Sequence, residues 1–154
     1  MANTTSAPRT GAERKRDLLA RLDTEHDVWV ASAGLDGTPC LVPLSLHWDG
    51  AVVWLSTRAD NPTGRNLREN GVVRLSLAST EAVVMVDGTV ETFSLEEADT
   101  ETADAFAARC GWDPRKARRG EYVWFRVTPT AVQAFQGRHE MPGRHLMTDG
   151  EWHV

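Results

Sequence analysis

The stretch from residue 54 to residue 77 most constrains the fold of this chain, because it marks both ends of a short helix between two strand patterns. Asn61 is a favoured N-cap residue, and Pro62 suits the first position of a helix. Gly71 is well placed to end the helix, since glycine readily adopts the left-handed conformation that follows a last turn. We therefore predict a strand, a short helix and a second strand.

The start of this helix is predicted to bind an anion. The backbone amides of Thr63, Gly64 and Arg65 are expected to point out of the first turn without partners, and unpaired amides attract phosphate. Arg58 and Arg65 add positive charge. Nearby hydroxyl groups are those of Ser56, Thr57 and Thr63. The alternative interpretation is a capped connector whose arginines, Arg68 among them, are only solvated. Neither the P-loop signature nor the Rossmann glycine signature occurs in the sequence.

Much of the remaining sequence has the pattern of short β-strands. Apolar and polar residues alternate, or β-branched and aromatic residues gather, in segments that turn residues separate. Strands are predicted at residues 27–33, 40–48, 51–57, 72–78, 82–93, 121–128 and 130–135. Strands this short and evenly spaced favour an antiparallel barrel of about six strands.

Local signals predict the turns and two further helices. Asp49-Gly50 predicts a two-residue hairpin turn, whereas Asp87-Gly88 is compatible with a turn or a β-bulge. Residues 13–23 carry leucines on one face and predict an amphipathic helix. The capping box from Ser94 to Glu97 predicts a helix that begins there and ends at Gly111.

Length and composition are those of one ordinary domain. With 154 residues, of which 41% are hydrophobic, the chain can form one core, expected over residues 12–154 after a flexible tail at residues 1–11. The formal net charge of −5 argues against a nucleic-acid partner, and no apolar run is long enough for a membrane span. Cys40 and Cys110 form neither a metal motif nor a disulfide framework, so we expect a cytoplasmic protein without a metal site.

The sequence assigns no catalytic residue. It contains neither a recognisable triad nor paired carboxylates, so the catalytic residues stay unknown at this point. Trp29 and Trp124 are predicted to lie in the core, as large aromatic side chains commonly do. Cys40 is predicted to be a small, buried residue and not a nucleophile, because no base stands beside it in the sequence.

Three short motifs point to one group of proteins. Asp36-Gly37-Thr38-Pro39 fits a D-G-x-P motif that precedes the second strand, and Gly64-Arg65-Asn66-Leu67 fits the end of a K-G-R-N-L motif. Phe135-Gln136-Gly137 fits a W-Q-G motif, and Arg144-His145 with residues 149–152 fits the C-terminal segment that follows it. Together these motifs resemble the flavin-binding split-barrel superfamily, that is the pyridoxamine 5′-phosphate oxidase-like proteins and their actinobacterial relatives that use the deazaflavin coenzyme F-420.

The resemblance implies a mainly β protein, namely a six-stranded antiparallel split β-barrel with peripheral helices. It implies a homodimer that binds a flavin-type cofactor in a cleft between its two chains and passes a hydride to or from a small organic substrate. The cofactor would be FMN or F-420, because the motif at residues 64–67 favours the deazaflavin and the C-terminal motifs favour FMN. A non-catalytic flavin or tetrapyrrole carrier is the alternative on the same fold.

The resemblance also assigns site residues. The backbone of Leu44 and Ser45 would hold the cofactor ring, while Thr57, Arg58 and Arg65 would hold its phosphate. The remaining residues of this predicted cofactor site, all at the helix start, are Asn61, Thr63, Gly64 and Asn66. The predicted substrate-binding residues are Arg144 and His145.

The chain also departs from the oxidases. Pro62-Thr63 stands where they have an Arg-Lys pair that grips the flavin phosphate, and Val42 and His47 stand where they have a flavin-contacting arginine and lysine. These departures argue against oxidation of pyridoxamine 5′-phosphate. The apolar residues within 137–154 predict an ordered tail that covers the partner's cleft.

Overall fold

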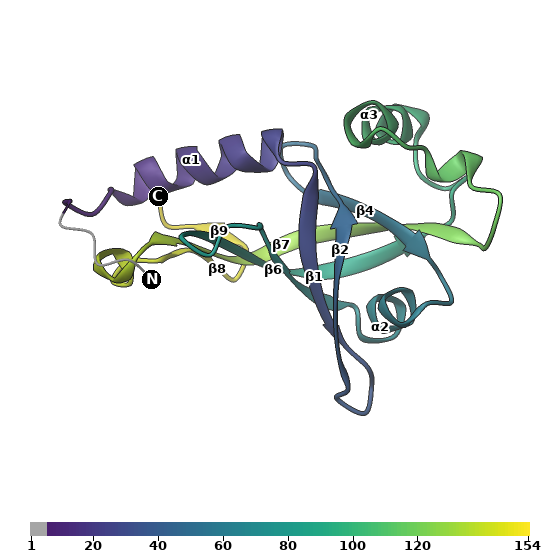
Figure 1. The fold of residues 1–154 in the computed structure, drawn as a ribbon, viewed down its shortest axis with the longest axis horizontal. Coiled ribbons are helices and arrows are strands. Elements are labelled where there is room, and N and C mark those ends of the chain that lie inside the picture. The colour runs from purple at the N-terminus through teal and green to yellow at the C-terminus, as the bar shows by residue number, and fades with distance from the viewer. Residues whose placement is uncertain (1–5) are drawn as a thin grey trace.

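The computed structural model describes residues 6–154, and within them nine strands form one antiparallel sheet that curls on itself (Figure 1). The strands are β1 (Asp27–Ala33), β2 (Pro39–Ser45), β3 (His47–Trp48), β4 (Val53–Arg58), β5 (Val72–Ser76), β6 (Ala82–Phe93), β7 (Tyr122–Gln136), β8 (His145–Thr148) and β9 (Glu151–Trp152). Their order along the sheet is β2-β1-β5-β6-β7-β4-β3, and β8 with β9 extends from β7. The predicted split-barrel class is confirmed, although the strand number is not six.

The chain brings the two ends of this sheet together at Leu46. The amide of Leu46 donates to the carbonyl of His26 (2.9 Å), which continues the pairing of β2 with β1, and the next two residues pair with β4 as β3. The predicted strand at residues 40–48 is therefore two strands that pair with different neighbours. Because β2 and β3 are opposite ends of the strand order yet contiguous in sequence, the sheet curls into a barrel.

Strand β2 contains two prolines, Pro39 and Pro43. Both stand at positions where the backbone nitrogen points away from β1. The even-numbered residues of β2 exchange hydrogen bonds with β1, as the bonds of Gly34 to Thr38 and of Leu46 to His26 show for the ends of the hairpin. The nitrogens of Pro39, Leu41 and Pro43 therefore point to the other side, where β4 lies beside β2 without a ladder between them. A proline has no N–H to donate there.

The two other strand corrections lie near the C-terminus. The two strands predicted on either side of Pro129 are one long strand, β7, because Pro129 lies opposite the β-bulge at Asp87-Gly88 and the ladder continues past it. This bulge was one of the two predicted possibilities. The segment 137–154 contributes β8 and β9, and its Leu146 and Met147 are buried in the barrel core of their own chain.

Three α-helices lie on the described part of the sheet, and two short 3-10 helices lie in its loops. They are α1 (Gly11–Thr24), α2 (Pro62–Asn70), α3 (Thr100–Cys110), η1 (Pro114–Lys116) and η2 (Arg138–Glu140). Helix α2 has the predicted caps, with Asn61 at its start and Gly71 in the left-handed conformation at its end (φ 64°). Within residues 6–154, no helix combines the length and the apolar character needed to cross a membrane.

The starts of α1 and α3 differ from the predicted ones. Helix α1 begins at Gly11, capped by Thr10, two residues before the predicted start at residue 13, and residues 1–5 of the predicted tail lie outside the described residues. Helix α3 begins after Asp99, whose side chain accepts from the amide of Thr102 (2.6 Å). The predicted capping residues at 94–97 form only a turn before it. The predicted end at Gly111 is confirmed.

Two apolar clusters fill the molecule. The larger one is the interior of the barrel, and the smaller one joins α3 to the outer side of β4 and β7 through Trp54, Phe106 and Trp124. Trp124 is fully buried, as predicted. Trp29 is 42% exposed, because Val28 and Val30 take the inward positions of β1 and leave Trp29 on the outer face. The core prediction for Trp29 is therefore wrong.

The hairpin between β3 and β4 is also longer than predicted. It spans residues 49–52 instead of two residues, and the side chain of Asp49 organises it. Asp49 Oδ1 accepts from the amides of Ala51 and Val52 (both 2.9 Å), and Oδ2 accepts from Trp54 Nε1 (3.0 Å). A carboxylate that holds the loop in this way replaces the tight turn expected of Asp-Gly.

A buried ion cluster ties the residues before α1 to η2. Glu140 is 1% exposed, and its carboxylate accepts from two nitrogens of the Arg9 guanidinium, with Nε–Oε1 at 3.0 Å and Nη2–Oε2 at 2.8 Å. Arg14, also buried, donates to the carbonyl of Glu140 (3.0 Å). We call Arg9, Arg14 and Glu140 the clasp. It holds α1 against the C-terminal part of the chain, where Lys15 also contacts Val154 and the ring of Trp152.

Candidate functional site

The predicted cofactor site is partly assembled where β2, β4 and α2 meet. Asn61 Nδ2 donates to Thr57 Oγ1 at the end of β4 (2.8 Å), and Asn61 Oδ1 accepts from the amide of Gly64 (2.7 Å). Thr63 is buried, and its hydroxyl lies 3.4 Å from the sulfur of Cys40 on β2. One polar cluster thus joins three elements that are distant in sequence.

Two of the three backbone amides that were predicted to be unpaired at the start of α2 already donate hydrogen bonds, so that prediction is wrong for them. The amide of Gly64 is taken by the capping side chain, and the amide of Arg65 donates to the carbonyl of Asn61 (2.9 Å) as the first bond of the helix. Of the three amides expected to be unpaired, only that of Thr63 is outside these two bonds. Positive charge at this site therefore comes mainly from side chains.

Three arginines surround the turn at residues 58–60, and we call them the three-arginine cluster. Arg58 holds the carboxylate of Asp60 with two parallel bonds, Nε–Oδ1 at 3.1 Å and Nη2–Oδ2 at 2.8 Å. Arg65 Nη1 donates to the carbonyl of Asp60, and Arg68 Nη2 donates to the carbonyl of Ala59, both at 2.6 Å. Arg68 lies three residues after Arg65 on α2, and its long side chain folds back to the same turn.

Glycines let the backbone and a guanidinium approach closely around this cluster. A Cβ atom on Gly64 would lie 2.1 Å from the carbonyl oxygen of Arg58, so only glycine lets α2 begin this close to β4. A Cβ atom on Gly120 would lie 2.4 Å from Arg58 Nε, and Gly120 has a positive φ of 82°. The amide of Ala59 donates to the carbonyl of Glu121 (2.8 Å), which fixes the turn to the start of β7.

The residues predicted to hold the cofactor ring lie at the other end of β2. Ser45 Oγ accepts from Trp112 Nε1 (3.0 Å), next to α3. Five residues of strand separate Ser45 from Cys40, which corresponds to roughly 16 Å. The ring and phosphate halves of the predicted site are therefore separate places joined by one strand. Asn66, the last residue of the predicted set, faces β1 and donates to Ser32 Oγ (3.1 Å).

The predicted substrate-binding residues lie at the start of β8, and β8 and α2 lie well apart within one chain (Figure 1). Arg144 Nε donates to Gln133 Oε1 (3.2 Å), and Arg144 Nη1 donates to the carbonyl of Met141 (3.0 Å). His145 is exposed at the start of β8. Within a single chain these two residues and the three-arginine cluster do not form one site.

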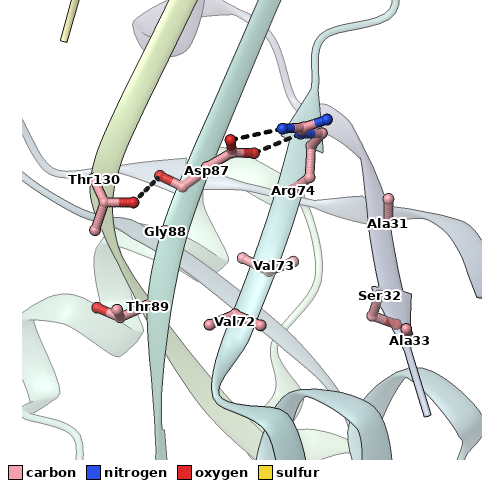
Figure 2. A pocket seen from close by; sticks show the side chains of 10 residues that line it. All are labelled: Ala31, Ser32, Ala33, Val72, Val73, Arg74, Asp87, Gly88, Thr89 and Thr130. Atoms are coloured by element: carbon pink, nitrogen blue, oxygen red, sulfur yellow. Dashed lines mark hydrogen bonds and ion pairs between the residues drawn. The ribbon is translucent and has the colours of Figure 1, made fainter. Parts of the chain in front are cut away.

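A groove on the outer face of the sheet was not predicted. It has a volume of about 500 Å³ and is lined mainly by residues of β1, β5 and β6 (Figure 2). Arg74 and Asp87 cross it as a two-bonded ion pair (2.6 and 2.8 Å), and Thr130 donates to the carbonyl of Asp87 (3.2 Å). Exposed Trp29, Leu41 and Val72 project from the same outer face. These residues come together only because β1, β5 and β6 pair side by side, and the sequence alone does not reveal that pairing.

Comparisons with known proteins agree with the fold. The sequence pattern of a family described as pyridoxamine 5′-phosphate oxidase matches residues 15–136. The solved structure of an F420 reductase has a TM-score of 0.61 with 22% identity, over 73% of this chain and 93% of that chain. A putative pyridoxamine 5′-phosphate oxidase from Listeria innocua has a TM-score of 0.61 with 16% identity, over 78% and 96%.

The heme storage protein HutZ from Vibrio cholerae is also similar, with a TM-score of 0.61 and 14% identity over 82% of this chain and 99% of that chain. No curated protein matches the sequence. At identities this low, the solved structures show only that the folds are alike.

Proposed function

The chain belongs to the pyridoxamine 5′-phosphate oxidase family, and from that premise we propose that it binds a flavin-type cofactor and transfers a hydride between this cofactor and a small organic substrate. FMN is the first candidate for the cofactor, and F-420 is the second. The cofactor would supply the hydride chemistry. The chain's own residues would bind it, orient it and keep water away from it.

The observation that carries this proposal is the three-arginine cluster beside the polar start of α2. Guanidinium groups bind phosphate oxygens through parallel N–H donors, and such charge-assisted bonds are the stronger ones. The donor set fits a phosphate group, because Arg58 already holds a pair of anionic oxygens in this geometry and Arg65 reaches the same turn from α2. Thr57 and Thr63 are buried nearby, where their hydroxyls contact Asn61 and Cys40. The backbone of Leu44 and Ser45 would lie along the ring at the other end of β2.

A titration of the purified protein with FMN, F-420 and riboflavin, followed by tryptophan fluorescence, tests this proposal. We expect Arg65→Ala to weaken FMN binding by about tenfold, because a charge-assisted bond contributes roughly 1.5 kcal/mol or more. Riboflavin, which has no phosphate, should bind the variant as it binds the wild type. Arg16→Ala is the matched control, since it removes another exposed arginine, which lies on α1. Equal affinity of the wild type for FMN and riboflavin would contradict a phosphate site.

A tetrapyrrole carrier is the competing proposal, and the likeness to a protein described as a heme storage protein favours it. A carrier would bind heme with a sharp Soret band and would show no phosphate-dependent affinity for FMN. The same purified protein can be titrated with heme and with FMN side by side. The ligand that binds at micromolar concentration with one site per chain decides between the two functions.

We further propose that two copies associate through the outer face of β1, β2 and β5. Trp29, Leu41 and Val72 are 42%, 61% and 58% exposed there, and apolar residues gathered on one face mark interaction sites. Leu41→Asp should convert a dimer into a species of 17.0 kDa in sedimentation at micromolar concentration. Thr80→Asp, which adds the same charge in an exposed loop between β5 and β6, should remain dimeric. A wild type that sediments as a monomer with cofactor present would refute the association.

A further inference from the structure

We propose that Asp60 is an intramolecular anion that occupies the phosphate site and that a ligand's phosphate must displace it. This inference rests on the proposed function. It concerns which residue sets the affinity for a phosphorylated ligand, and Asp60 belongs to none of the motifs that suggested the site.

The geometry of the Arg58–Asp60 pair supports this role. The two parallel bonds use Arg58 Nε and Nη2, the same side-on fork with which arginine holds two phosphate oxygens. The ion pair is open to solvent, with Arg58 45% and Asp60 67% exposed. Exposed ion pairs are weak, so a stronger anion can take the place of this carboxylate.

The other two arginines leave the site positively charged. Arg65 and Arg68 donate to backbone carbonyls, which are neutral, and within residues 6–154 neither of them is in an ion pair. The pKa of Asp60 is lowered, first by the hydrogen bonds from Arg58 and then by the charges of Arg58 and Arg65, so the carboxylate is ionised at neutral pH. Three cations therefore face one resident anion.

Displacement of Asp60 needs only a side-chain rotation. The backbone of the turn is held by the bond from Ala59 to Glu121, by Arg65 and Arg68, and by the cap of α2 at Asn61. The displaced carboxylate would remain close to the incoming phosphate and repel it. Asp60 therefore opposes phosphate binding twice, once by holding Arg58 and once by its own charge.

Replacing Asp60 by asparagine tests the inference. Asp60→Asn keeps the shape and removes the charge, so FMN should bind about threefold to tenfold more tightly than to the wild type, while riboflavin binding should not change. Inorganic phosphate should compete with FMN at a correspondingly lower concentration. Asp104→Asn is the matched control, because Asp104 is also an exposed carboxylate paired with an arginine, Arg115, but lies on α3. Fluorescence titration reports binding without any turnover.

The outcomes separate this inference from the proposed function. If the wild type prefers FMN to riboflavin and Asp60→Asn raises that preference, both stand. If the wild type prefers FMN and Asp60→Asn leaves the preference unchanged or lowers it, Asp60 is not a competitor and the inference is wrong. If neither protein prefers FMN, there is no phosphate site and both proposals fail. A preference for FMN that exists only in Asp60→Asn would contradict the proposed function of the wild type and would show that Asp60 blocks the site.

Discussion

Gly64→Ala is expected to destabilise the protein by about 2–4 kcal/mol and to abolish the preference for FMN over riboflavin, because it adds a Cβ atom where backbone stands. That atom would lie 2.1 Å from the carbonyl oxygen of Arg58 and 3.1 Å from the carbonyl carbon of Ala59. Neither can move freely, since β4 is paired with β7 and Ala59 is bonded to Glu121. Helix α2 must shift instead, and Arg65 and Arg68 shift with it.

Chemical denaturation with the FMN titration measures this effect. Gly11→Ala is the control, since it also places alanine at a helical glycine but meets only the flexible side chain of Val154. It should be neutral or slightly stabilising, because alanine favours helix over glycine by about 1 kcal/mol. If Gly64→Ala unfolded like the wild type and kept its affinity for FMN, the close approach of α2 to β4 would not matter for the site.

Glu140→Ala is expected to cost about 3–5 kcal/mol of stability, because it leaves Arg14 buried and Arg9 without its main carboxylate. The carboxylate also accepts from the amides of Arg9 (2.9 Å) and Gln136 (2.7 Å), so its loss removes four bonds at once. Asp17→Asn is the control. Asp17 pairs with the same Arg9 but is 40% exposed, so this change should cost less than about 1 kcal/mol.

The pH dependence of stability gives an independent measure of the clasp. Burial by itself raises the pKa of Glu140, but the hydrogen bonds from Arg9 and the two amides outweigh it and lower the pKa from 4.5 to about 2. A lowered carboxyl pKa stabilises the folded state above the unfolded value, and this contribution is lost as the pH falls from about 4.5 to about 2. Glu140→Gln should lack this part of the acid dependence. If the two proteins lost stability in parallel over that range, the clasp would not be ionised as described.

The sequence predicted those parts of the structure that depend on neighbouring residues. Asn61, Pro62 and Gly71 define α2 by local chemistry, and the structure has these caps in the predicted places. The start of α3 was missed because two capping sequences stand close together, and the one at Asp99 forms the cap. Two competing local signals can be ranked only when the packing of the helix is known.

Other features depend on contacts that no short sequence window contains. Trp29 is exposed because its neighbours on β1 face the core. The pairing of β1 with β2 and β5 sets which side of β1 faces inward. Arg68 reaches the site because its side chain bends back along the helix, which helical spacing alone does not indicate. The groove over β1, β5 and β6 likewise exists only once those strands are paired.

The two prolines of β2, Pro39 and Pro43, leave one edge of that strand short of backbone hydrogen-bond donors. Had Pro39 and Pro43 been residues with an N–H, β2 could have formed a ladder with β4, and anything entering between them would have had to break backbone hydrogen bonds first. With those donors missing, β2 pairs with β1 alone and forms no ladder with β4. The unpaired edge belongs to the same strand that links Ser45 to Cys40, the two ends of the proposed cofactor site. The missing pairing on this edge of β2 is therefore set by the amino-acid sequence itself, because proline cannot donate a backbone hydrogen bond there.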